Sequence, residues 1–135
     1  MKKYAPTVLR IGLSLVFLWF GTQQLLHTAS WLKMIPQSIV DISGFTAPTL
    51  VHFNGAFEIV FGICLLLGFF TRITALLLSL HLLNITFVVG YGATGVRDFG
   101  LSFAMISLFL YGADSVSLDA WLAKRNFSKG QSDMQ

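Results

Sequence analysis

Four apolar blocks, at about 7–26, 50–70, 73–90 and 99–113, dominate the sequence. An α-helix needs roughly 20 residues to cross a hydrocarbon layer about 30 Å thick. Only 11% of the 135 residues are charged, whereas soluble domains carry about a quarter. We therefore expect an all-α integral membrane four-helix bundle. It forms one domain over residues 1–125, which leaves no room for a large soluble catalytic domain.

Two of the blocks depart from an ideal span. A signal peptide is the alternative interpretation of the first block, but this block is long for a signal sequence and contains Arg10, Gln23 and Gln24. A retained span is therefore favoured. The fourth block is the shortest, because about 15 residues rise only about 22 Å. It is expected to borrow flanking residues or to lie where the bilayer is locally thinned.

Polar and turn-forming segments separate the blocks. Residues 28–49 are interrupted by prolines and a glycine and are expected to form an interfacial loop with one or two short helices, anchored by Trp31. In the turn after the second block, Gly68 is expected to end one helix and Thr71 to cap the next. The second and third spans then form an antiparallel hairpin. Residues 126–135 are polar and are expected to form a disordered tail.

The positive charges predict how the bundle is oriented. Four crossings put both ends of the chain on one side, and that side holds seven of the nine lysines and arginines: Lys2, Lys3, Arg10, Arg72, Lys124, Arg125 and Lys129. By the positive-inside rule both termini are cytoplasmic, in the cytoplasmic (inner) membrane. The charges form no continuous stripe, so no nucleic acid partner is expected. The expected partners are the lipid bilayer and, as an open alternative, a second copy of this chain.

Glu58 is the most informative polar residue within the blocks. Counted along the second span, it lies roughly 12 Å below the outer surface, where a charge costs on the order of 2.5 to 3.5 kcal/mol. Gly55 and Gly62 share its helix face and offer a seam of small residues for a neighbouring helix. Glu58 is therefore expected to face protein rather than lipid.

Other polar residues are expected to reach a similar depth. Asn84 is level with Glu58, and His81 lies on the same helix face about a turn deeper. The sequence predicts a polar pocket in the outer half of the bundle, formed by Gln24, Glu58, His81, Asn84, Arg97 and Asp98. Glu58 and Arg97 are the candidate catalytic residues, and Gln24, His81, Asn84 and Asp98 are the candidate ligand-binding residues.

A purely structural interpretation remains open for several of these residues. Buried polar side chains also hold helices together, at about 0.6 kcal/mol each. Asp98 is equally able to cap the fourth helix and Arg97 to extend to the lipid headgroups. Ionisable residues at this depth are functional by default, which favours a role for Glu58.

No protein metal site is expected from the sequence. His27 and His52 fall at the outer ends of the first two spans and raise a bis-histidine haem as a weak alternative. Cys64 is the one cysteine, so neither an internal disulfide nor a CxxC pair exists.

Several short motifs resemble the DoxX family of small membrane proteins. They are LR at 9–10 with Gly12, GTQQL at 21–25, GAFE at 55–58, LGFFTR at 67–72, RDFGL at 97–101 and SLD at 117–119. The resemblance implies a four-helix membrane bundle with a redox association. Relatives include a quinone-reducing thiosulfate oxidoreductase subunit and membrane partners of enzymes that handle oxidative or thiol stress.

The resemblance also bears on the candidate site. Glu58, Arg97 and Asp98 match polar positions of the family, but Gln24 stands where the family commonly has lysine. This departure removes a cationic partner for Glu58 and leaves Arg97 as its candidate counter-charge.

Three functions follow as hypotheses. The first is a DoxX-like component of a redox system that binds a quinone, in which the redox chemistry belongs to the quinone and to a soluble redox enzyme as partner. The second is a non-catalytic scaffold that docks a soluble enzyme through the basic tail or the Trp31 loop. A small solute or proton carrier ranks last, because four short spans leave little room for alternating access.

Overall fold

The computed structural model describes residues 4–132, with side chains up to residue 126. Four long helices, α1 (Ala5–Leu26), α3 (Ala47–Leu67), α4 (Thr71–Val89) and α5 (Ala93–Tyr111), are long and apolar enough to cross a membrane. The chain is 84% helical, and the described residues contain no strand. The prediction of an all-α membrane bundle is confirmed.

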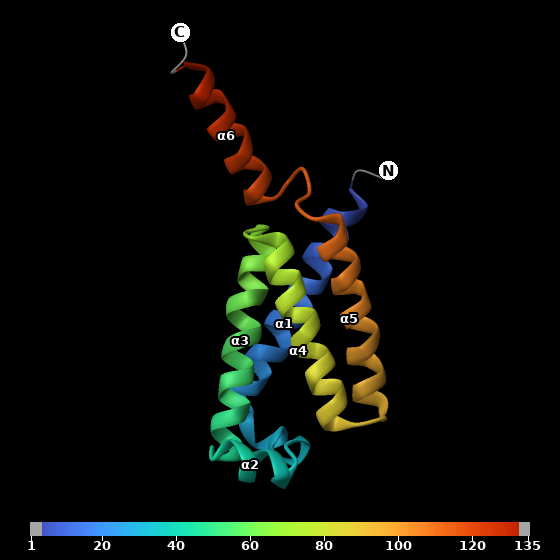
Figure 1. Ribbon diagram of the computed structural model, residues 1–135. Coiled ribbons are helices and arrows are strands. Elements are labelled where there is room, and N and C mark those ends of the chain that lie inside the picture. Colours follow the sequence, from blue (N-terminus) through green and yellow to red (C-terminus); the bar gives the residue numbers. More distant parts are fainter. Residues whose placement is uncertain (1–3, 133–135) are drawn as a thin grey trace.

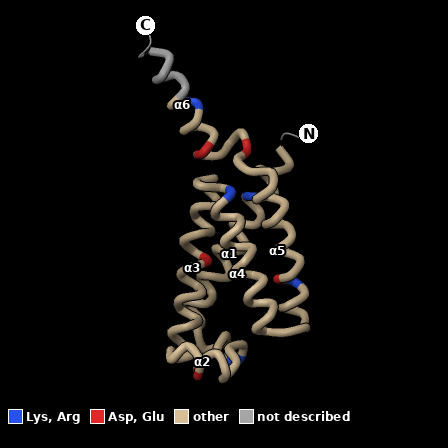
Figure 2. Tube along the Cα trace, in the orientation of Figure 1, with Lys and Arg blue, Asp and Glu red and all other residues tan. Residues whose placement is uncertain are grey.

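The shorter elements lie at the two ends of the bundle. Between α1 and α3 come two 3₁₀ turns, η1 (Thr28–Ser30) and η2 (Leu32–Met34), and the short helix α2 (Gln37–Ser43). We call this the loop end. The chain starts, α3 turns into α4 and α5 stops at the opposite end, the terminal end, beyond which helix α6 (Leu118–Ser132) extends (Figure 1). Figure 2 shows the charged residues gathered mostly near these two ends.

The four long helices form two close pairs. Helix α1 packs along α3, and α4 packs along α5, whereas α3 and α4 touch over a shorter length. From their shared turn at the terminal end, α3 and α4 spread apart toward the loop end (Figure 1). The predicted hairpin of the second and third spans is therefore antiparallel but splayed.

Glycines bring α1 and α3 together. A Cβ on Gly21 would lie 2.7 Å from the carbonyl oxygen of Gly55, and a Cβ on Gly55 would lie 2.9 Å from the oxygen of Gly21. Gly62, on the same face of α3, meets Phe17 and Leu18 of α1. The predicted seam of small residues is thus the contact between these two helices, and it turns Glu58 inward.

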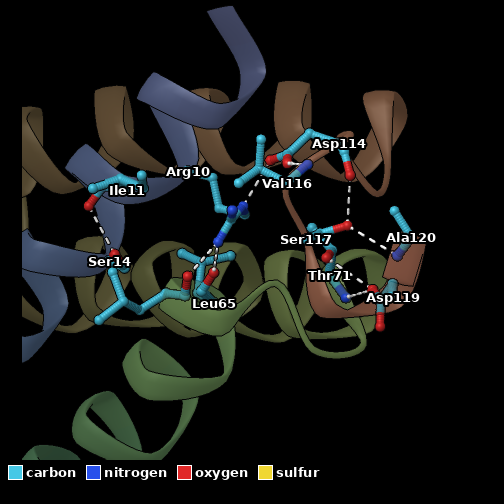
Figure 3. Close-up of polar contacts among 11 residues, drawn as sticks. Arg10, Ile11, Ser14, Leu65, Thr71, Asp114, Val116, Ser117, Asp119 and Ala120 are labelled. Atoms are coloured by element: carbon cyan, nitrogen blue, oxygen red, sulfur yellow. Dashed lines mark hydrogen bonds and ion pairs between the residues drawn. The ribbon is translucent and has the colours of Figure 1, made fainter. Parts of the chain in front are cut away.

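The turn between α3 and α4 is capped by a residue that lies far along the chain. Gly68 ends α3 with φ 68°, as expected, and a Cβ there would lie 2.5 Å from that of Ser117. Thr71 does not cap α4, because Phe70 occupies the N-cap position. Instead the Asp119 carboxylate accepts hydrogen bonds from the backbone N–H groups of Phe70 (2.8 Å) and Thr71 (2.7 Å) and from the Thr71 hydroxyl (2.8 Å; Figure 3).

Two other sequence expectations are corrected. The fourth span starts at Ala93 rather than at residue 99, so its 19 residues rise about 28 Å and no thinned bilayer is needed. Gly92 precedes it as the N-cap, and the charged pair at 97–98 lies inside the helix. The segment expected to be a disordered tail from residue 126 is helical up to Ser132 as part of α6, whose first turn holds the Asp119 cap. Residues 133–135 lie outside the described residues.

The apolar core fills the terminal half of the bundle. Its buried side chains come from all four long helices and include Leu13, Phe17, Leu65, Ala75, Leu78, Leu82, Met105 and Leu108. These positions lie mostly near the turn between α3 and α4, where the helix pairs meet. Packing is therefore tightest at the terminal end.

A buried arginine ties the terminal end together. Arg10 of α1 is 1% exposed. Its Nε donates to Asp114 Oδ2 at 2.7 Å, and its Nη1 donates to the carbonyl oxygens of Leu65 (2.8 Å) and Leu66 at the end of α3 (Figure 3). A cation at a helix C-terminus meets carbonyls that have no partner within the helix. Arg10, which the sequence placed only among the orienting charges, thus joins α1, α3 and the segment after α5.

The ionisation of Asp114 reflects this environment. Burial alone would raise the pKa of its carboxyl. The hydrogen bonds from Arg10 and the Val116 N–H, together with the Arg10 charge, outweigh burial, and the pKa is lowered. The carboxylate therefore stabilises the folded chain most fully above the ordinary aspartate pKa of about 3.9.

Replacing Asp114 with asparagine should destabilise the bundle. Asp114→Asn leaves a buried guanidinium without its counter-charge, and such a loss costs about 3 kcal/mol. The free energy of unfolding, measured by SDS titration in mixed micelles, should fall by that order, whereas Asp41→Asn in the exposed loop should change it little. The unchanged protein should lose this contribution as the pH falls from 5 through about 3.9 and below, and Asp114→Asn should lack that component. If Asp114→Asn and Asp41→Asn unfold with the same free energy, the role given to Arg10 is contradicted.

The glycine seam makes a second prediction. Gly21→Ala places a methyl group against the Gly55 backbone, which cannot give way as a flexible side chain can, so unfolding should become easier by roughly 1 to 3 kcal/mol. Gly12→Ala is the matched control on the same helix, because nothing lies within 4 Å of its added Cβ. It should be neutral or slightly stabilising. Both are measured by the same titration, and equal effects would show that α1 and α3 do not meet at Gly21.

Candidate functional site

A cavity of about 270 Å³ lies in the loop half of the bundle, between the two helix pairs. Side chains from α1, α3, α4, α5 and the segment 28–46 line it, and most are apolar. All six residues that the sequence assigned to a pocket are among them: Gln24, Glu58, His81, Asn84, Arg97 and Asp98. The structure brings these residues together, and their chemical roles stay predictions.

Glu58 lies at the centre of a hydrogen-bond network and is 3% exposed. Gln24 Nε2 donates to its Oε2 at 3.0 Å, and Asn54 Nδ2 donates to its Oε1 at 3.2 Å. Asn54 Nδ2 also lies 2.6 Å from Gln24 Oε1, so the three side chains form a closed set. Two amide donors on opposite oxygens stabilise a carboxylate where water is excluded.

Asn54 is a site residue that the sequence analysis missed. Its position contains a usable signal, because it precedes Glu58 by four residues and so shares its helix face. Gln24 stands at a position where the resembling family commonly has lysine. Here it gives the Glu58 carboxylate a neutral hydrogen-bond donor in place of a cation.

His81 lies opposite Glu58, on α4. Its Nε2 is 3.6 Å from Glu58 Oε1, which is beyond hydrogen-bond length, and this buried nitrogen has no hydrogen-bond partner among the described residues. The ring lies against Phe57, with centroids 4.5 Å apart. His81 thus presents an unused nitrogen beside the carboxylate.

Asn84 differs from its predicted position. The sequence placed it level with Glu58, but His81 occupies that level, and Asn84 lies a turn nearer the loop end. It is exposed while also lining the cavity. Asn84 therefore belongs to the rim of the cavity rather than to the network around Glu58.

Arg97 does not neutralise Glu58, so that prediction is wrong. Its Nε and Nη2 each lie 2.7 Å from Asp98 Oδ1, and its guanidinium lies 4.3 Å above the ring of Phe20 on α1. Asp98 is buried and adjacent to Arg97 in sequence, and its carboxylate forms the ion pair with the Arg97 guanidinium. Asp98 also lies five residues inside α5, so the alternative that it caps this helix is wrong as well.

The two histidines at the loop end have different surroundings. His52 Nε2 lies 2.8 Å from the Thr28 hydroxyl, and His27 follows the last residue of α1. Among the described residues, no group of three or more histidine, cysteine, aspartate or glutamate side chains is placed to hold a metal ion.

The arrangement can bind and protonate a small polar group inside an apolar cavity. Glu58 can hold or release a proton there, and His81 Nε2 can accept or donate a hydrogen bond. Apolar walls with a few convergent polar groups are typical of small-molecule sites.

Comparison with known proteins gives one match, to a family model. The sequence model of the DoxX family matches residues 5–91, which is more than half of the chain and includes α1, α3 and α4 with Gln24, Glu58 and His81. Searches of curated proteins and of solved structures each found no match. This chain is a member of the DoxX family.

Proposed function

We propose that this DoxX-family protein is a component of a redox system in the cytoplasmic (inner) membrane, with both termini in the cytoplasm, and that its cavity binds a quinone. The observation that carries the proposal is Glu58, a carboxyl group held by two amides inside an apolar cavity and near the middle of a candidate membrane-spanning helix. Ionisable residues at such depth mark sites of function more often than of packing.

The cavity fits a quinone ring in size and chemistry. A cavity of about 150 Å³ already admits benzene, and this one measures about 270 Å³. A quinone ring is flat and uncharged with two carbonyl oxygens. The Glu58 carboxyl in its protonated form and His81 Nε2 are the groups that can hydrogen-bond to such oxygens.

Glu58 and His81 have distinct roles in this proposal. When bound, a quinone would supply two-electron chemistry, with the electrons and one of the two protons coming from a partner redox enzyme and the other proton from Glu58. Glu58 holds one proton at its carboxyl oxygen and exchanges it, while Gln24 and Asn54 stabilise the carboxylate that remains. His81 orients the ligand through Nε2, and the pair Arg97 and Asp98 closes the cavity on the side of α1 and α5.

A scaffold function is the second candidate, favoured by α6. This helix extends beyond the bundle and carries Lys124 and Arg125 (Figures 1 and 2). The guanidinium of Arg125 lies 5.4 Å from the ring centroid of Trp121. A soluble redox enzyme docked there would not depend on Glu58, so its co-purification with Glu58→Leu separates the two functions.

Ligand binding should be measurable from the fluorescence of one tryptophan. Of the three tryptophans, Trp31 lines the cavity and Trp19 does not. In the background Trp19→Phe with Trp121→Phe, a benzoquinone should quench Trp31 fluorescence with saturation. Glu58→Leu should weaken binding roughly two- to tenfold, because it removes the carboxyl hydrogen bond, which contributes about 0.5 to 1.5 kcal/mol, whereas a glutamine amide would still donate to a quinone oxygen.

Two controls make this measurement decisive. Asp41→Asn removes an exposed carboxyl of the loop end and should leave binding unchanged. A chain that retains only Trp19 should show weak, non-saturating quenching. Equal affinity of Glu58→Leu and the unchanged protein, both shown to be folded by their thermal unfolding, would refute the proposed site.

A further inference from the structure

We infer that the ligand of this cavity is an uncharged amphiphile with a hydrocarbon tail, which reaches Glu58 sideways from the bilayer through a gap between α3 and α4. The inference rests on the proposed function and adds to it the class of ligand and its path.

Three sides of the cavity are largely covered by side chains. Between α1 and α5, Arg97 lies over the ring of Phe20. At the loop end, Trp31 packs edge-on against Phe20, with centroids 5.8 Å apart. Met34, Ile35 and Ile39 of the segment 28–46 line the cavity beside Trp31. At the terminal end lies the buried apolar core.

The fourth side, between α3 and α4, is open. Phe53 of α3 and Asn84 of α4 both line the cavity and are both exposed, with Phe53 72% exposed. A side chain with both properties lies on the rim of an opening. Met34 at the loop end and Arg97 of α5 have both properties as well, but at 37% and 40% they are less exposed than Phe53, so the wider opening is the one between α3 and α4. The rim therefore lies on α3 and α4, the two helices that diverge toward the loop end (Figure 1). Because both helices are candidate membrane spans, this opening faces lipid tails rather than water.

The polarity of the cavity lining changes between its deep part and the loop end. The polar groups of Glu58 and His81 lie deep, near the middle of α3 and α4. Nearer the loop end the lining is mostly apolar, with Ile85, Val88 and Val89, and includes the polar side chains of Asn84 and Thr94. A ligand that fits this order places its polar ring at depth and leaves an apolar tail toward the opening. A charged head would have to be carried through hydrocarbon, which is costly, so the ring is uncharged.

Cysteine accessibility tests the path without relying on quinone binding. Val51 is buried and lines the cavity, so Val51→Cys in a Cys64→Ser background places the chain's one thiol inside. In liposomes, this thiol should react with an alkyl-tailed maleimide and resist an anionic, water-soluble thiosulfonate. Each rate is divided by that of Ser43→Cys, at an exposed position at the end of α2, measured with the same reagent.

Blocking variants identify the opening. Asn84→Phe narrows the gap and should slow labelling of Val51→Cys by the tailed maleimide about tenfold. Val96→Phe, at an exposed position of α5 that does not line the cavity, should leave the rate unchanged. Met34→Phe at the loop end should also leave it unchanged.

The opposite results overturn the inference. Equal labelling by the anionic reagent, or slowing by Met34→Phe in place of Asn84→Phe, would show access from water through the loop end. Absence of labelling by either reagent would show that no opening exists. The Trp31 titration decides separately whether a quinone binds, so failure of the path and failure of the proposed function are distinguishable.

Discussion

The structure depends on how Arg10 is buried. A guanidinium that is buried in protein needs partners, and this one uses the Asp114 carboxylate and two carbonyls at the end of α3. Together with Asp119 at the start of α4, it closes the terminal end, where the apolar core also lies. The glycine seam then holds α1 on α3, and α3 and α4 are left to diverge toward the loop end. The cavity is the consequence of a bundle fastened at one end.

Glu58 is likewise buried with hydrogen-bond partners, but a polar group beside it is left without one. Its two oxygens accept hydrogen bonds from Gln24 and Asn54, so the carboxylate is satisfied by neutral donors. His81 Nε2 lies beside it with no hydrogen-bond partner among the described residues, and the space next to both is hollow. A site built only to join helices would fill that space with side chains. The unused nitrogen and the cavity together support a ligand rather than a purely structural role.

The sequence predicts most of the fold and the membership of the site, but fewer of its contacts. Hydropathy places four spans, and depth counted along helices groups Gln24, Glu58 and His81, because both depend on local periodicity. The start of α5 at Ala93 was missed, since a charged pair that satisfies itself is tolerated inside a helix. The Arg97 partner, the Asp119 cap and the Arg10 contacts join residues far apart in the chain or depend on which neighbour is nearer in space, and no local pattern encodes them.

The central claim, that a neutral ring binds beside Glu58, is tested most directly by photoaffinity labelling in liposomes with a tailed azidoquinone, followed by mass-spectrometric mapping of the labelled residues. The account predicts label on cavity-lining positions of α3 and α4 such as Asn54 and Ile85, reduced by an excess of unlabelled quinone. Label confined to lipid-facing positions such as Phe87 and Leu110, which are 83% and 69% exposed, and unaffected by competition, would contradict it.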